Sequence, residues 1–158
     1  MKLSLSAKVL TALAGKRLAT AESLTGGGIG QAITSVSGAS AVFAGGVISY
    51  TNEVKHKMLG VPKELLDHKG PDCQLVAIAM AKGAKRILGA DVAVSVTGLA
   101  GPEGDTFGIP IGTVFIGYAD DTYTLAQEYH FEGSRSDIRE ATIIAALQLV
   151  LAMNSQKG

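Results

Sequence analysis

Three consecutive glycines shortly after a short apolar segment constrain this chain more than any other feature of its sequence. The segment Arg17–Ala21 has the small apolar residues of a strand, Glu22–Gly28 supplies a tight turn, and a helix to about Ser35 follows. Glycines before a helix let backbone N–H groups approach an anion, and the helix end adds partial positive charge. The segment therefore predicts an α/β fold with a site at this turn, although a Ser or Thr cap followed by packing glycines has the same local sequence.

Helical and strand-like segments alternate first, and two strand-like segments follow each other late in the chain. We expect helices over Ser4–Ala14, Glu53–Leu59 with Asn52 as its cap, Pro62 to His68, Cys73–Leu88 between Asp72 as its cap and Gly89, and Arg135–Met153. We expect a buried strand over Gly46–Tyr50, a central strand over Asp91–Val96, and a hairpin of Ile111–Tyr118 and Thr122–Phe131. This order predicts one α/β domain over residues 1–158, a three-layer α/β/α fold whose mixed sheet includes a C-terminal antiparallel hairpin.

Composition and charge exclude several classes of function. The 14 basic and 14 acidic side chains sum to a formal charge of zero, which argues against a basic nucleic-acid-binding surface. No apolar run reaches the roughly 20 residues that a membrane span needs. The lone Cys73 cannot form an internal disulfide, which favours a reducing, cytoplasmic location. His56, His68 and His130 lack metal-ligand spacing, so we expect no metal site.

Three unusual loops follow the predicted strands that end at Ala21, Tyr50 and Val96. In open α/β sheets, sites lie outside the carboxyl ends of the strands, so we expect these loops to converge. Ser23 in the first loop is placed as a nucleophile or a substrate-binding hydroxyl. The third loop, Thr97–Asp105, is rich in glycine, which is typical of a site but also of a long turn before the hairpin.

Lys55 lies on the first turn of the helix that follows the second loop. The helix dipole disfavours a cation there, and with burial it would lower the pKa of the amine so that it can act as a base. A solvated surface lysine remains the commoner environment for a single Lys. A nearby Glu22 carboxylate would act in the opposite direction and raise this pKa.

Arg135 and Arg139 are four residues apart at the start of the last predicted helix, beside Ser134 as a cap. Residues at this spacing share one helix face, and two guanidinium groups suit a phosphate group. A pair of solvated arginines bonded to nearby carboxylates is the alternative.

Four sequence blocks occur in an order that resembles a known family. They are TAESLTGG, GGVISYTNEVKHKMLGV, VTGLAGPEG with IGTV, and FEGSRSDIREAT, and together they cover about residues 3–152. Their order and spacing resemble the CinA C-terminal domain family, the deamidase part of competence/damage-inducible protein A, also found as a stand-alone nicotinamide-nucleotide amidohydrolase. The resemblance implies hydrolysis of the carboxamide of nicotinamide mononucleotide to nicotinic acid mononucleotide and ammonia, without a metal or an organic cofactor. It implies a small-molecule nucleotide as the partner, and it leaves a homo-oligomer open.

The resemblance also implies roles for individual residues. Ser23, Tyr50 and Lys55 match the catalytic residues of the family: Ser23 attacks, neutral Lys55 accepts the proton, and Tyr50 orients or relays it. Direct attack by a water that the same groups activate is equally compatible with the sequence. The expected substrate-binding residues are Glu22, Thr25, Gly26, Gly27, Thr97, Gly98, Gly101, Arg135 and Arg139.

The chain departs from the family pattern at three places. Leu24 stands where the family usually has Cys, and Gly70-Pro71-Asp72-Cys73 stands where it usually has Gly-Ala-Val-Ser. Ile109 stands where the family often has Lys before Pro-Val-Gly, and we expect this change to weaken phosphate binding or to alter the nucleotide preference. The departures leave a second hypothesis open, a nucleotide-binding domain with weak or no catalysis.

Overall fold

The computed structural model describes residues 1–155, which form six α-helices, one 3₁₀ helix and five β-strands. In chain order the elements are α1 (Lys2–Ala12), β1 (Leu18–Glu22), α2 (Gly28–Thr34), η1 (Ala39–Ala41), β2 (Phe43–Ile48), α3 (Asn52–Leu59), α4 (Lys63–Lys69), α5 (Gln74–Ile87), β3 (Val92–Gly98), β4 (Thr113–Ala119), β5 (Thr124–His130) and α6 (Arg135–Asn154).

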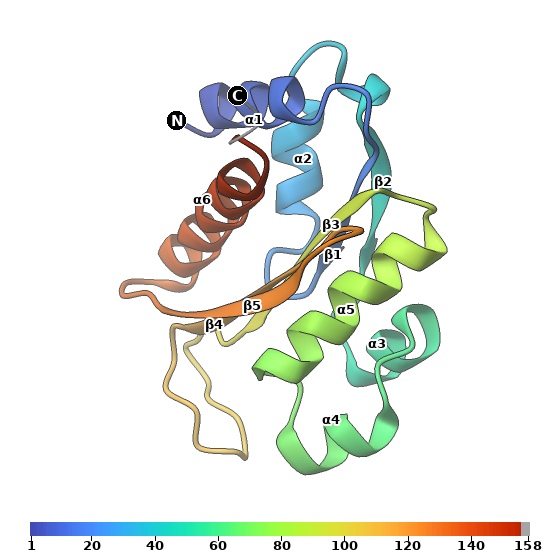
Figure 1. The fold of residues 1–158 in the computed structure, drawn as a ribbon. Helices are drawn as coiled ribbons and strands as arrows, with labels where there is room; N and C mark the ends of the chain where they lie inside the picture. Colours follow the sequence, from blue (N-terminus) through green and yellow to red (C-terminus); the bar gives the residue numbers. More distant parts are fainter. Residues whose placement is uncertain (156–158) are drawn as a thin grey trace.

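The five strands form one mixed sheet in the order β2-β1-β3-β4-β5. Strands β2, β1 and β3 are parallel, whereas β4 runs antiparallel to both β3 and β5. Helices α1, α2 and α6 cover one face of the sheet, and α3, α4 and α5 lie on the other (Figure 1). The predicted three-layer α/β fold with a C-terminal hairpin is confirmed, and β3 is the central strand as expected.

Alternating side chains of the inner strands fill two separate cores. Val92, Val94 and Val96 of β3 pack toward α1, α2 and α6, whereas Ala93 packs toward α5. Small residues on the second face let α5 lie directly on the sheet. A Cβ at Gly117 of β4, for example, would collide with the backbone carbonyl of Ala77 in α5.

Three sequence predictions about local structure are wrong. The strand predicted as buried over Gly46–Tyr50 is the edge strand β2, which has β1 as a neighbour on one side only. It ends at Ile48, whose side chain is 57% exposed. The cap of α3 is Thr51, whose hydroxyl accepts from the backbone N–H of Val54 at 3.3 Å, and Asn52 is instead the first helical residue.

The third correction concerns Asp72. Helix α5 begins at Gln74, and the residue before it, Cys73, makes no side-chain cap hydrogen bond. Asp72 lies outside the helix and is turned toward β3, where Thr97 binds it. The predicted Ser134 cap of α6, by contrast, is confirmed by its bond from the Asp137 backbone N–H.

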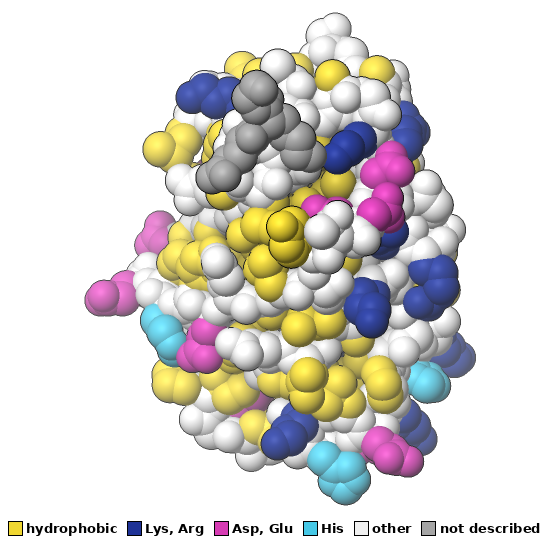
Figure 2. Space-filling model, viewed as in Figure 1, with side chains coloured by type: hydrophobic (Ala, Val, Ile, Leu, Met, Phe, Trp, Pro, Cys, Tyr) yellow, Lys and Arg dark blue, Asp and Glu magenta, His cyan; other side chains and the backbone are white. Residues whose placement is uncertain are grey.

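The surface carries both signs of charge. Figure 2 shows hydrophobic side chains gathered across the middle of one face, with acidic and basic side chains interspersed around them. No helix of the described residues is both long enough and apolar enough to cross a membrane.

Candidate active site

The three predicted loops meet at one edge of the sheet. Because β1, β2 and β3 are parallel, their carboxyl ends lie together, and Glu22 pairs with Ile48 on one side and Val96 on the other. A cleft of about 280 Å³ opens there, lined by residues of all three loops, of α3, of the segment before α5 and of α6: Ser23, Leu24, Tyr50, Lys55, Pro71, Asp72, Gly98, Leu99, Ala100, Gly101, Glu103 and Arg135. The expected convergence of the loops is therefore present.

Ser23 and Lys55 form a hydrogen-bonded pair in this cleft. The Lys55 Nζ donates to Ser23 Oγ at 3.0 Å and to the backbone carbonyl of Tyr50 at 3.1 Å. Lys55 is 1% exposed, although lysine is normally a surface residue. Burial lowers the pKa of Lys55 to about 8, while the negative charge of Asp72 acts in the opposite direction. The neutral amine that a base requires is thus accessible near neutral pH.

Asp72 is a member of the cleft that sequence reasoning missed. It is 5% exposed, and its Oδ1 accepts a hydrogen bond from the Thr97 hydroxyl at 2.7 Å. Burial raises the pKa of its carboxyl group, and the Thr97 hydrogen bond and the Lys55 charge oppose that rise. The departure of position 72 from the family pattern is the one signal in the sequence that points to Asp72. Its place directly before a helix instead favours the interpretation as a helix cap.

Tyr50 and Arg135 lie at the rim of the cleft. The Tyr50 side chain is 59% exposed, and its hydroxyl is 3.4 Å from Nη2 of Arg135. Arg135 Nη1 donates to the Gly101 carbonyl at 2.7 Å. Lys55 therefore contacts the backbone of Tyr50 and not its phenol, which speaks against the expected proton relay through the tyrosine hydroxyl.

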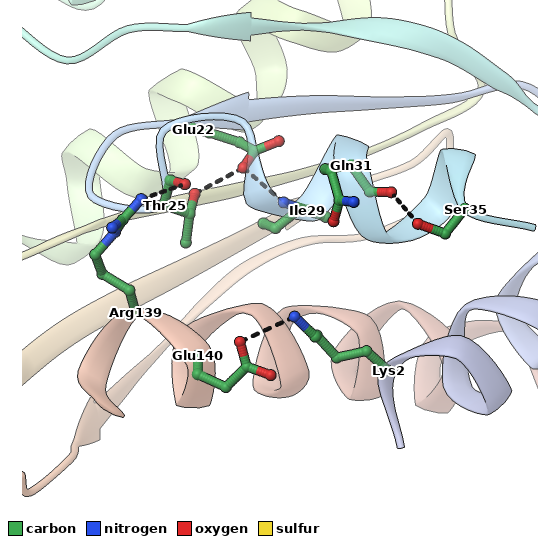
Figure 3. A network of polar contacts seen from close by, with 8 residues as sticks. All are labelled: Lys2, Glu22, Thr25, Ile29, Gln31, Ser35, Arg139 and Glu140. Atoms are coloured by element: carbon green, nitrogen blue, oxygen red, sulfur yellow. Dashed lines mark hydrogen bonds and ion pairs between the residues drawn. The ribbon is translucent and has the colours of Figure 1, made fainter. Parts of the chain in front are cut away.

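The Glu22 carboxylate faces α2 and not Lys55. It accepts from the Thr25 hydroxyl at 2.7 Å and from the Ile29 N–H at 2.9 Å (Figure 3). It also accepts from the Gly30 N–H at 3.0 Å. The expected opposing charge on Lys55 thus comes from Asp72 and not from Glu22. A buried carboxylate with this set of donors holds the turn after β1 against the start of α2, which speaks against its expected contact with the substrate.

The glycine turn and Arg139 form a neighbouring cleft of about 420 Å³. Gly26 and Gly27 have φ angles of +62° and +100°, which suit glycine far better than other residues. Arg139 Nε donates to the Leu24 carbonyl at 2.9 Å, and Nη2 donates to the Thr25 carbonyl at 3.3 Å (Figure 3). Arg139 thus holds the loop that carries Ser23, whereas Arg135 lines the cleft that contains Ser23.

This arrangement has the parts that acyl transfer requires. It holds a hydroxyl beside an amine of lowered pKa, and within residues 1–155 the backbone N–H groups of Leu24 and Ala100 have no hydrogen-bond partner. Free N–H groups in the same cleft as a nucleophile can stabilise a developing oxyanion. No three His, Cys, Asp or Glu side chains of the described residues gather in a way that would hold a metal ion.

Comparisons with known proteins agree with this architecture. Residues 2–154 match the family model described as the CinA C-terminal domain. A solved structure of competence damage-inducible protein A from Klebsiella pneumoniae superposes with a TM-score of 0.95 at 30% identity and covers 99% of both chains. A competence/damage inducible protein from Agrobacterium tumefaciens gives a TM-score of 0.93 at 37% identity, over 97% of this chain and 95% of that one.

Curated relatives fall into two size classes. The nicotinamide-nucleotide amidohydrolase PncC of Pseudomonas putida is 41% identical over 140 residues, which cover 89% of this chain and 88% of that protein. A CinA-like protein of Geobacter sulfurreducens is 47% identical over 133 residues, which cover 84% of this chain but 32% of that protein. The chain thus spans about a third of the length of the CinA-like relatives that it matches.

Proposed function

The chain belongs to the CinA C-terminal domain family, and from this premise we propose that it is a nicotinamide-nucleotide amidohydrolase. It converts nicotinamide mononucleotide and water to nicotinic acid mononucleotide and ammonia. The observation that carries the proposal is the 3.0 Å contact between Lys55 Nζ and Ser23 Oγ in a cleft at the carboxyl ends of the parallel strands. The 41% identity to PncC of P. putida supports the choice of substrate.

In the first half of the reaction, Ser23 Oγ attacks the carboxamide carbon while neutral Lys55 accepts the hydroxyl proton. The N–H groups of Leu24 and Ala100 stabilise the negative oxygen of the tetrahedral intermediate. The Lys55 ammonium group then returns a proton to the amide nitrogen, the C–N bond breaks, and ammonia leaves. A Ser–Lys pair is a known variant of the nucleophile–base arrangement.

In the second half, water attacks the acyl group on Ser23 and gives up a proton to Lys55. The bond between the acyl carbon and Ser23 Oγ breaks, and the Lys55 ammonium group returns the proton to that oxygen. A single attack by a Lys55-activated water uses the same residues and gives the same products. Trapping an acyl group on Ser23 separates the two routes.

The size of the cleft determines how the nucleotide would lie. A volume of about 280 Å³ is just below the roughly 300–1,000 Å³ typical of small-molecule sites. We assign the interior to the pyridine carboxamide and the rim to the ribose phosphate, where the Arg135 guanidinium group and the Tyr50 hydroxyl lie. Arg139 is assigned to the support of the Ser23 loop.

The decisive experiment measures ammonia and the acid product when the purified protein is incubated with nicotinamide mononucleotide. Both products in equal amounts are expected, and Ser23→Ala should abolish them without abolishing nucleotide binding. Binding of the nucleotide by the unaltered protein without release of ammonia would favour the alternative, a nucleotide-binding domain without turnover. We further propose that the protein acts in the cytoplasm on this small molecule, without a cofactor.

A further inference from the structure

Asp72 and Lys55 place two ionisable side chains in the same buried cleft. Lys55 comes from α3 and is 1% exposed, and Asp72 comes from the segment before α5 and is 5% exposed. Within residues 1–155 they share neither a hydrogen bond nor an ion pair within 4.0 Å, because Lys55 Nζ is directed at Ser23 and the Tyr50 carbonyl. Charges that do not touch still interact strongly where little water separates them.

Thr97 holds Asp72 in a fixed orientation. The Thr97 hydroxyl, which is fully buried in β3, is 2.7 Å from Oδ1 of Asp72. Oδ2 of Asp72 has no hydrogen-bond partner among the described residues, and this atom is not fully buried. It is therefore open to the cleft that also contains Ser23 and Lys55.

The other ionisable groups around Lys55 are less well placed to act on it. Glu103 and Arg135 also line the cleft, but both are exposed to solvent, which screens their opposite charges. Tyr50 presents its carbonyl to Lys55, and its phenol lies outside at the rim. Asp105, in the loop after β3, acts on Asp72. Asp72 is thus the buried charge that faces the pair.

We propose that Asp72 is a positioning residue of the Ser23–Lys55 pair, whose negative charge sets how readily Lys55 takes up a proton. The proposal rests on the proposed function for its kinetic consequence, but the effect of Asp72 on Lys55 does not depend on turnover. The charge stabilises the ammonium form and so opposes the burial of Lys55. Asp72 therefore stabilises the ammonium form that Lys55 adopts once it has taken the Ser23 proton, and it moves the working range of the base to higher pH.

The test is the variant Asp72→Asn, which keeps the size of the side chain and an oxygen for Thr97 but removes the charge. Lys55 should lose its proton more easily, so the acidic limb of the pH profile of kcat/KM should move down by on the order of one pH unit. At pH values well below the midpoint of the acidic limb, kcat/KM of the variant should then be about tenfold higher than that of the unaltered protein. General damage to the fold lowers activity at every pH and does not produce such a gain.

Two controls separate charge from structure. Asp72→Glu should restore the original limb, because it returns the carboxylate, and Glu103→Gln should move the limb far less, because solvent screens that exposed group. In parallel, NMR of protein with ¹⁵N-labelled lysine follows the titration of Lys55 Nζ in the unaltered protein and in Asp72→Asn.

A Lys55 titration that stays in place or moves to higher pH in Asp72→Asn would overturn the proposal. If the unaltered protein releases no ammonia, the proposed function fails. The NMR titration then still decides whether Asp72 controls Lys55.

Discussion

The side-chain nitrogen of Lys55 lies 3.0 Å from the hydroxyl oxygen of Ser23, although 32 residues separate them in the chain. Two parallel strands bring them together, since Ser23 follows β1 and Lys55 lies in the helix that begins shortly after β2. Both residues are buried, and within the cleft Lys55 Nζ donates to Ser23 and to the Tyr50 carbonyl. The first two predictions follow from this pair.

Lys55→Arg should lower kcat by about two to four orders of magnitude, the usual contribution of a general base, because arginine does not deprotonate in this range. Nucleotide binding, measured by calorimetry, should persist. Ser23→Ala should lose as much, and the double variant should lose little more, because residues that act as a unit are not additive. Near-normal turnover of Lys55→Arg would reduce Lys55 to an electrostatic or structural role.

The pH profile of the unaltered protein should report the pKa of Lys55. Since burial lowers that pKa to about 8 and only the neutral amine accepts a proton, kcat/KM should rise tenfold per pH unit and level off above about pH 8. Measuring kcat/KM from pH 6 to pH 10 checks the sign and the midpoint. A profile that falls through this range would assign the titration to an acid that must stay protonated.

Arg135 and Arg139 should have separable effects. Arg135→Ala should raise KM for nicotinamide mononucleotide by about 10- to 100-fold, the size of a lost hydrogen bond to a charged group, and leave KM for nicotinamide riboside nearly unchanged. Arg139→Ala should lower kcat for both substrates alike, because it removes the hydrogen bonds to the Leu24 and Thr25 carbonyls through which Arg139 holds the Ser23 loop. Equal effects of both variants on both substrates would contradict the assignment.

Glu22→Gln should destabilise the fold by about 1–3 kcal/mol, because an amide cannot accept from Thr25, Ile29 and Gly30 at once without directing its own N–H groups at a donor. Denaturant unfolding measures the change. The matched control is Glu140→Gln, which removes the half-exposed ion pair with Lys2 and should cost less than about 1 kcal/mol. Equal losses of unfolding free energy in the two variants would show that Glu22 does not have this structural role.

Gly117→Ala should destabilise the fold by about 1–3 kcal/mol, because the added Cβ collides with the Ala77 carbonyl and pushes α5 off the sheet. Gly104→Ala, in the loop after β3, meets no atom within 4 Å and should change stability by less than about 0.5 kcal/mol. A thermal unfolding midpoint unchanged in both variants would show that α5 can move away without cost.

Local sequence determined much of the fold and the location of the candidate site. The alternation of helical and strand-like segments predicted the α/β class, and the loops after β1, β2 and β3 predicted the edge where the cleft opens. These predictions succeed because the spacing of apolar residues and the residue types of turns are local properties of the sequence. In addition, parallel strands bring their carboxyl ends together whichever side chains they carry. The family blocks added the residue types that the cleft contains.

Tertiary structure alone decided which side chain meets which within that edge. The residues before α5 have the sequence of a helix cap, yet Asp72 turns to Thr97, because β3 presents a buried hydroxyl to it. Glu22 turns away from Lys55, because the N–H groups of α2 satisfy its buried charge. Each choice depends on donors that lie close in space and far apart in the chain. The sequence by itself therefore determined the fold class and the place of the site, and packing decided that Asp72, and not Glu22, faces Lys55.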